Sequence, residues 1–119
     1  MSTTFDLVTI DSPHPAVLAV FWVEALGLVE TEREDGDRWV VLSEPSGQRR
    51  VGIQRGPTRV GGGVHLDLRC PVDEFASEVA RLLALGATAV GTPRQEPYGY
   101  LANLLDPDGN PVDLCAYNE

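Results

Sequence analysis

The sequence predicts an α+β protein made of two similar halves, each running strand, helix, then three strands. Two helical apolar patterns each end at a glycine, Gly27 and Gly86, and β-type runs surround them in the same order. A glycine-rich segment separates the halves. We therefore expect a single domain over 1–119, with module one at 5–55, a hinge at 56–63 and module two at 64–119.

The first half opens with a short β-forming run at 5–10, followed by a turn that contains two prolines. Proline suits the first turn of a helix, because the N–H group that it lacks would be unpaired there. Apolar residues then recur at helical spacing over 16–26, and Gly27 ends this helix. Three β-type runs separated by turns follow at 28–34, 38–43 and 50–55.

The second half repeats this order. Apolar and polar residues alternate over 64–70, as in a strand with one buried face. Asp73 is placed to cap a helix whose apolar stripe runs from Phe75 to Leu83, and Gly86 ends that helix. The remaining β-type runs are 88–90, 100–105 and 111–117, with a tight turn at 106–110 before the last.

Each amphipathic helix must cover one face of its own sheet, which leaves the other face without a helix. In the outer strands of module two, apolar side chains alternate with polar ones, so the polar set should point to the open face. That set comprises His65, Asp67, Arg69, Asp113, Cys115 and Tyr117. The open face is therefore where we expect a ligand to bind.

The composition excludes several classes of partner. The net charge is −9, from 18 acidic residues and 9 arginines, and such a surface repels nucleic acid. No apolar run is long enough to cross a membrane, and the first residues do not resemble a signal peptide, so we expect a cytoplasmic protein. Cys70 and Cys115 lack metal-type spacing and are expected to be free thiols.

Four segments resemble the vicinal oxygen chelate superfamily, which has the fold of glyoxalases, bleomycin resistance proteins and extradiol dioxygenases. The segments are Phe21–Gly27, Val64–Leu68, Leu83–Ala87 and, most specifically, Asp106–Leu114 with its Asp-Pro-Asp-Gly-Asn turn. Together they span nearly the whole chain, which looks closest to the small glyoxalase-like branch. The resemblance implies two tandem βαβββ modules whose sheets form an open cup, and it implies a homodimer.

Metal enzymes of this superfamily take one ligand from the first strand and one from the last strand of each module. By this resemblance His65 and Asp113 match the two positions of module two, although the family usually has glutamate at the second. Gln54 matches the last-strand position of module one. The first-strand position falls on Asp6, at the spacing that separates the two helix-ending glycines, or on Leu7 if the register slips by one. One divalent metal, Zn, Fe, Ni or Mn, would be the cofactor, but leucine cannot ligate it.

Each candidate residue has a structural alternative. His65 is either a metal ligand or a histidine that is hydrogen-bonded within the sheet. Asp67 and Arg69 either hold a substrate or form an ion pair with each other. Trp39 either lines the cup or packs at a dimer contact, and Tyr100 belongs either to a loop that closes over the ligand or to an ordinary surface loop.

Two functions remain open. The first is a small-molecule binding protein of the glyoxalase and bleomycin-resistance type, with its ligand held in the cup. The second is a metal-dependent lyase, dioxygenase or isomerase that acts on a small oxygen-rich substrate. Because few metal ligands are in view, the sequence favours binding and leaves catalysis undecided. The expected ligand-binding residues are Gln54, His65, Asp67, Arg69, Asp113, Trp39 and Tyr100.

Overall fold

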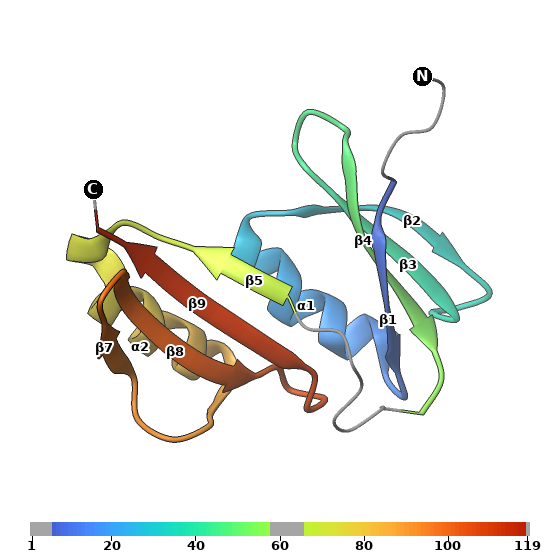
Figure 1. The fold of residues 1–119 in the computed structure, drawn as a ribbon. Helices are drawn as coiled ribbons and strands as arrows, with labels where there is room; N and C mark the ends of the chain where they lie inside the picture. Colours follow the sequence, from blue (N-terminus) through green and yellow to red (C-terminus); the bar gives the residue numbers. More distant parts are fainter. Residues whose placement is uncertain (1–5, 58–65, 119) are drawn as a thin grey trace. The chain divides into compact units, whose positions relative to one another are not determined.

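The computed structural model describes residues 6–57 and 66–118, which fall into two compact units, Met1–Thr58 and Arg59–Glu119 (Figure 1). Each unit is a small sheet with one α-helix packed on it. His65 and most of the expected hinge lie outside the described residues.

The first unit contains one helix and four strands. Its elements are β1 (Val8–Ser12), α1 (Pro15–Leu26), β2 (Val29–Glu34), β3 (Trp39–Ser43) and β4 (Arg49–Arg55). The strands are ordered β1-β4-β3-β2, with β1 parallel to β4 and the other pairs antiparallel. A parallel pair needs a crossover connection, and α1 provides it while packing on the sheet.

The second unit repeats this plan with a broken edge strand. Its elements are β5 (Leu66–Arg69), a 3₁₀ turn (Val72–Glu74), α2 (Phe75–Leu85), β6 (Thr88–Ala89), β7 (Arg94–Glu96), β8 (Gly99–Leu105) and β9 (Pro111–Tyr117). β5 lies parallel to β9, and β6 and β7 both pair with β8. Two modules with a first strand parallel to the last confirm the expected α+β fold.

Three local expectations are corrected. The first strand is Val8–Ser12 rather than 5–10, because Asp11 and Ser12 pair with the end of β4 instead of forming a turn. Asp73 does not cap α2, because it lies within the 3₁₀ turn that precedes the helix. β7 follows a Gly-Thr-Pro segment and was not expected, because its three polar residues show no apolar alternation.

Both helices end as the glycines predicted. Gly27 adopts a left-handed conformation (φ 66°), and its N–H group donates to the carbonyl of Val23. Gly86 has φ 121°, and its N–H group donates to the carbonyl oxygens of Leu82 and Leu83. Leu18 and Trp22 of α1 and Leu82 of α2 are buried, so each helix contributes a face to the core of its own unit.

The turn between β8 and β9 is organised by a buried carboxylate. Asp106 is 2% exposed and accepts hydrogen bonds from the backbone N–H groups of Asp108 and Asn110, and from the Asn110 side-chain amide. Burial raises the pKa of Asp106, and these hydrogen bonds act in the opposite direction. The same turn was the most specific motif in the sequence, and its role is to fix the β8–β9 hairpin.

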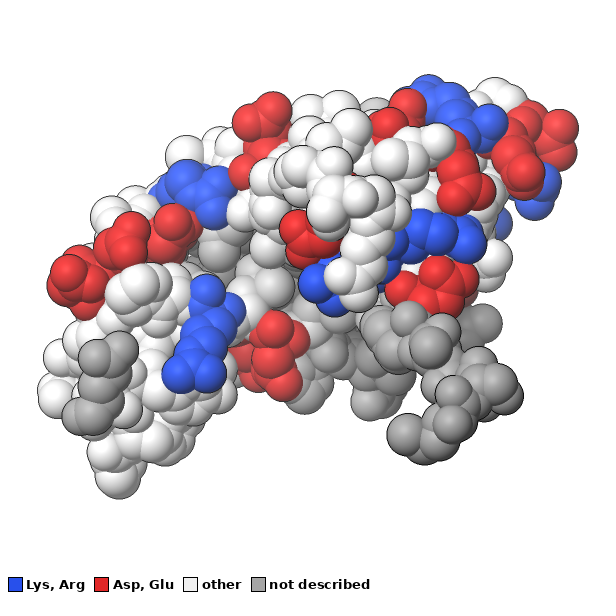
Figure 2. All heavy atoms as spheres, turned by 90° about the horizontal axis from the view of Figure 1, so that it is seen from above, with Lys and Arg blue, Asp and Glu red and all other residues white. Residues whose placement is uncertain are grey.

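The charged surface mixes both signs. Figure 2 shows acidic and basic side chains interspersed over the face that it displays, and most of the described arginines are in ion pairs. No helix in the described part of the chain is long and apolar enough to cross a membrane.

Candidate functional site

The polar face of the second sheet is built by strand pairing. In the parallel register, Asp67 of β5 lies beside Asp113 of β9, and Arg69 lies beside Cys115. Val112, Leu114 and Ala116 are buried with the helix side of the sheet, as alternation predicts. Asp67 and Asp113 therefore share the face that α2 does not cover.

A chain of hydrogen bonds holds Asp113. The side-chain amide of Asn103 in β8 donates to Asp113 Oδ1 over 2.7 Å. Arg94 of β7 donates from Nη1 to Asn103 Oδ1 over 2.9 Å, and its Nε also donates to Glu96 over 3.0 Å. The arginine therefore orients the amide, and the amide orients the carboxylate.

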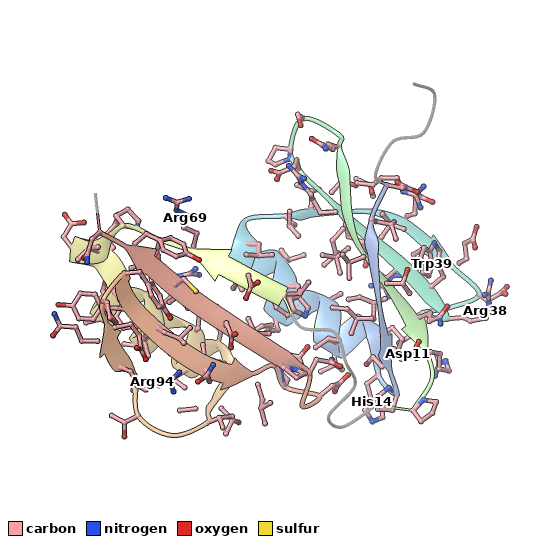
Figure 3. The ribbon with its side chains drawn as sticks, viewed as in Figure 1. Asp11, His14, Arg38, Trp39, Arg69 and Arg94 are labelled. Atoms are coloured by element: carbon pink, nitrogen blue, oxygen red, sulfur yellow. The ribbon has the colours of Figure 1, made fainter. Side chains whose placement is uncertain are left out.

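The far end of the same face is aromatic. The guanidinium carbon of Arg69 lies 4.9 Å from the centre of the Tyr117 ring. Tyr98, in the turn between β7 and β8, has its ring centre 5.9 Å from that of Tyr117. A hydrogen bond with Cys115 is the largest cause that raises the pKa of Tyr117, and the nearby Arg69 acts in the opposite direction. Arg69 projects outward from β5 in Figure 3.

Arg69 and Tyr117 border a pocket of about 910 Å³ within the second unit. Its lining consists of Arg69, Cys70, Pro71, Val72, Asp73, Tyr117 and Asn118. Cys70 and Cys115 are free thiols, as expected. Burial is the main cause that raises the pKa of Cys70, and the carboxylates of Glu78 and Glu74 add to it.

The first unit has its own polar cluster on the face that α1 leaves open. Gln54 donates from its amide to Asp11 over 2.7 Å, across the parallel β1–β4 pair. Trp39 pairs in register with Gln54, and its ring lies over Gly52, so closely that a Cβ at this glycine would overlap the ring. Trp39 and Asp11 are both labelled in Figure 3.

The structure distributes the described residues of the expected site over different faces of the two sheets. Asp67, Arg69 and Asp113 lie on one open face, and Gln54 and Trp39 lie on another within their own unit. Tyr100 does not lie in a loop: it belongs to β8, and its ring stacks on Phe75 of α2, with centres 5.4 Å apart. It therefore faces the covered side of the sheet, away from Asp113.

Sequence reasoning missed Asn103, Arg94 and Asp11. Asn103 could have been found, because it breaks the apolar run of β8 at a position opposite Asp113. Arg94 gave no such signal, because β7 itself was not recognised. Asp11 was assigned to a turn, whereas it extends β1 and pairs with Gln54.

The described residues do not make a metal centre by themselves. Over 6–57 and 66–118, no group of three or more histidine, cysteine, aspartate or glutamate side chains is placed to hold an ion. The amide of Gln54 is bonded to Asp11, and Asp6, the candidate for the first strand, pairs with Arg49 at 3.1 Å. The carboxylates of the expected ligand positions in this part of the chain are Asp113 and Asp6, and Asp6 is already paired with Arg49.

A family model described as "Glyoxalase-like domain" matches residues 7–115, nearly the whole chain. The chain belongs to the glyoxalase-like domain family. This places it in the glyoxalase, bleomycin resistance and dioxygenase (vicinal oxygen chelate) superfamily, as the sequence motifs indicated. No curated protein matches the chain.

Solved structures of this superfamily share the fold. One is a glyoxalase/bleomycin resistance protein/dioxygenase family enzyme from Burkholderia phytofirmans PsJN, with 18% identity, a TM-score of 0.77, and coverage of 95% of this chain and 98% of that one. Another is a mutant of the fosfomycin resistance protein FosX from Listeria monocytogenes, complexed with Mn(II) and 1S,2S-dihydroxypropylphosphonic acid. It has 16% identity, a TM-score of 0.80, and coverage of 99% and 93%.

Proposed function

We propose that this protein is a small-molecule binding protein of the glyoxalase and bleomycin-resistance type, acting as one domain over 1–119. Its ligand would contact Asp67, Arg69 and Asp113 on the open face of module two. Gln54 and Trp39 would contribute from module one, and His65 would be a further ligand-binding residue.

The hydrogen-bonded chain from Arg94 through Asn103 to Asp113 is the observation that supports this proposal. A polar group that is already oriented binds a ligand with less loss of conformational entropy than a mobile one. Asp113 is only partly exposed. Removing a carboxylate from water costs free energy unless hydrogen bonds or opposite charges compensate for it. Stability alone does not require a hydrogen-bonded row of polar side chains across three strands, since apolar residues at these positions would stabilise the sheet as well.

Binding can be tested by titrating isotope-labelled protein with a panel of small oxygen-rich molecules and following backbone amide resonances. We expect saturable shifts at Asp67, Asn103 and Asp113, and their loss in Asp113→Asn. Glu78→Gln is the matched control, because it removes one charge from α2, on the covered side of the same sheet. A panel that shifts only residues of the covered face, or a response that Asp113→Asn leaves unchanged, would contradict the proposal.

The alternative is a metal-dependent lyase, dioxygenase or isomerase, favoured by the Mn(II) in the FosX structure. His65, Asp113 and Gln54 would hold one divalent ion, Zn, Fe, Ni or Mn. Such an ion supplies a Lewis acid for paired substrate oxygens. Elemental analysis of protein purified without chelator or affinity tag tests this: about one ion per chain in wild type, and none in His65→Ala, would support it. Metal-free wild type that takes up none of the four ions on dialysis would reject it.

We further propose a homodimer in the cytoplasm. Val17 and Val20 on the outer side of α1 are 69% and 64% exposed, and such an apolar helix surface is suited to a protein contact. Free thiols suit a reducing compartment. Light scattering should give twice the mass of one chain at micromolar concentration, and a monomer mass throughout would reject the dimer.

A further inference from the structure

We propose that the pocket at the ends of β5 and β9 binds a singly charged carboxylate attached to an aromatic ring or similar apolar body. This inference rests on the proposed function, because it names the class of small molecule that module two would bind. Arg69 and Tyr117 are the last residues of two parallel strands, so both border the pocket at the same end of the sheet.

Arg69 differs from the other arginines of the described chain. There are nine arginines, and Arg59 lies outside the described residues. Seven of the remaining eight form ion pairs with carboxylates, namely Arg33, Arg38, Arg49, Arg50, Arg55, Arg81 and Arg94. Arg69 has no carboxylate partner within 6–57 and 66–118, although the net charge of the protein is −9. Its charge is therefore available to an anionic ligand.

The Tyr117 ring holds the guanidinium of Arg69 in place. The 4.9 Å contact is a cation–π interaction, and Tyr117 is itself supported by the ring of Tyr98. A guanidinium that stacks on a ring retains its in-plane N–H groups, which match the two oxygens of a carboxylate. Holding the side chain beforehand lowers the entropy lost when an anion binds.

The rest of the pocket selects among anions. Val72 and Tyr117 are 37% and 41% exposed, so they offer apolar surface to the body of the ligand. Asp73 also lines the pocket, and it has no ion-pair partner among the described residues. Because the negative charge of Asp73 repels a doubly charged ligand more strongly than a singly charged one, a carboxylate should bind better than a doubly charged phosphonate.

The test uses three probes of similar shape, which are benzoate, neutral benzamide and phenylphosphonate. With the labelled full-length protein, benzoate should shift the amide resonances of Arg69, Val72 and Tyr117 saturably, and benzamide should not. Arg69→Gln should weaken benzoate binding roughly ten- to hundred-fold, the range for hydrogen bonds to a charged group. Asp73→Asn should improve phenylphosphonate binding more than benzoate binding.

Arg81→Gln is the matched control, because it removes the same charge from an exposed position on α2 of the same unit. It should bind benzoate as wild type does. Arg69→Lys, which keeps the charge without the forked geometry, should bind benzoate with an affinity between those of wild type and Arg69→Gln. Equal benzoate binding by wild type and Arg69→Gln would overturn the inference, as would an equal loss in Arg81→Gln. Saturable shifts at Asn103 and Asp113 that do not depend on Arg69 would overturn this inference alone, while the proposed function would stand.

Discussion

Asn103 donates a hydrogen bond of 2.7 Å to Asp113 directly across the β8–β9 ladder, and Arg94 holds the other side of the same amide. The three residues come from three neighbouring strands of one sheet. This relationship makes Asn103 a positioning residue for Asp113, and its role can be measured without knowing the ligand.

Replacing Asn103 with aspartate should destabilise the protein more at neutral pH than in acid. At pH 7 the two carboxylates would lie opposite each other, which raises the folded-state pKa of at least one of them above its unfolded value. A carboxylate whose pKa is higher in the folded than in the unfolded state stabilises the folded protein at pH values below its unfolded-state pKa. This stabilisation is lost as the pH rises through the folded-state pKa. Urea unfolding should therefore show a loss of about 1–3 kcal/mol at pH 7 that shrinks towards pH 4.

The control for this series is Asn103→Leu, which removes the hydrogen bonds without adding charge. Its destabilisation should be about 1 kcal/mol and should depend little on pH. If Asn103→Asp and Asn103→Leu lose the same stability at both pH values, the side chain at 103 does not face Asp113 in solution.

Replacing Gly52 with alanine should displace Trp39. The added Cβ would overlap the indole ring, and forced side-chain shifts in packed regions typically cost about 1–3 kcal/mol. In a Trp39→Leu background the same substitution should be nearly neutral, because the overlapping ring is gone. The measurement is a double-mutant cycle by chemical unfolding, and additive effects of the two changes would contradict this packing.

Cys70 should react with an alkylating reagent only at high pH. Burial, Glu78 and Glu74 all raise its pKa, so the reactive thiolate forms at a higher pH than the ordinary cysteine value of about 8.5. The rate of reaction with iodoacetamide can be followed against pH in a Cys115→Ser background. Glu78→Gln should move the profile towards lower pH, whereas Glu96→Gln should leave it in place; equal profiles for wild type and Glu78→Gln would be contrary to this expectation.

The sequence predicted the elements with strong periodicity and the faces of the outer strands. Gly27 and Gly86 fixed both helix ends, and alternation placed Asp67, Arg69 and Asp113 on one face. The sequence did not predict elements whose structure depends on pairing with another strand. β7 is three polar residues that become a strand only because β8 lies beside them.

The candidate site shows the same division. Alternation within a strand reveals which side chains share a face, but not which of them bond across strands. The Asn103–Asp113 and Gln54–Asp11 pairs depend on registers that become known only when the sheets are formed. Tyr100 begins the expected strand 100–105, while Pro97 and Gly99 before it also favour a loop. Its stacking on Phe75 is a long-range contact that no local pattern reports.

The start of α1 depends on a residue from another part of the first unit. The first helical turn has no acidic side chain, and His14 at the N-cap makes no side-chain capping bond. Asp37, in the turn between β2 and β3, supplies the missing acceptor, since its Oδ2 accepts from the Ala16 N–H group over 3.1 Å. Its other oxygen accepts from Arg55 at the end of β4.

Asp37→Ala should therefore destabilise the protein by about 1–2 kcal/mol, the usual effect of losing a helix cap. Asp37→Asn keeps an oxygen for Ala16 and should lose only the ion-pair part, about 0.2–1 kcal/mol, which added salt reduces. The matched control is Asp35→Asn, which breaks the exposed pair with Arg38 in the same turn and should change stability by less than about 0.5 kcal/mol. Unfolding in urea at low and high salt separates the two contributions. Equal midpoints for Asp37→Ala and Asp35→Asn would mean that the carboxylate does not cap the helix.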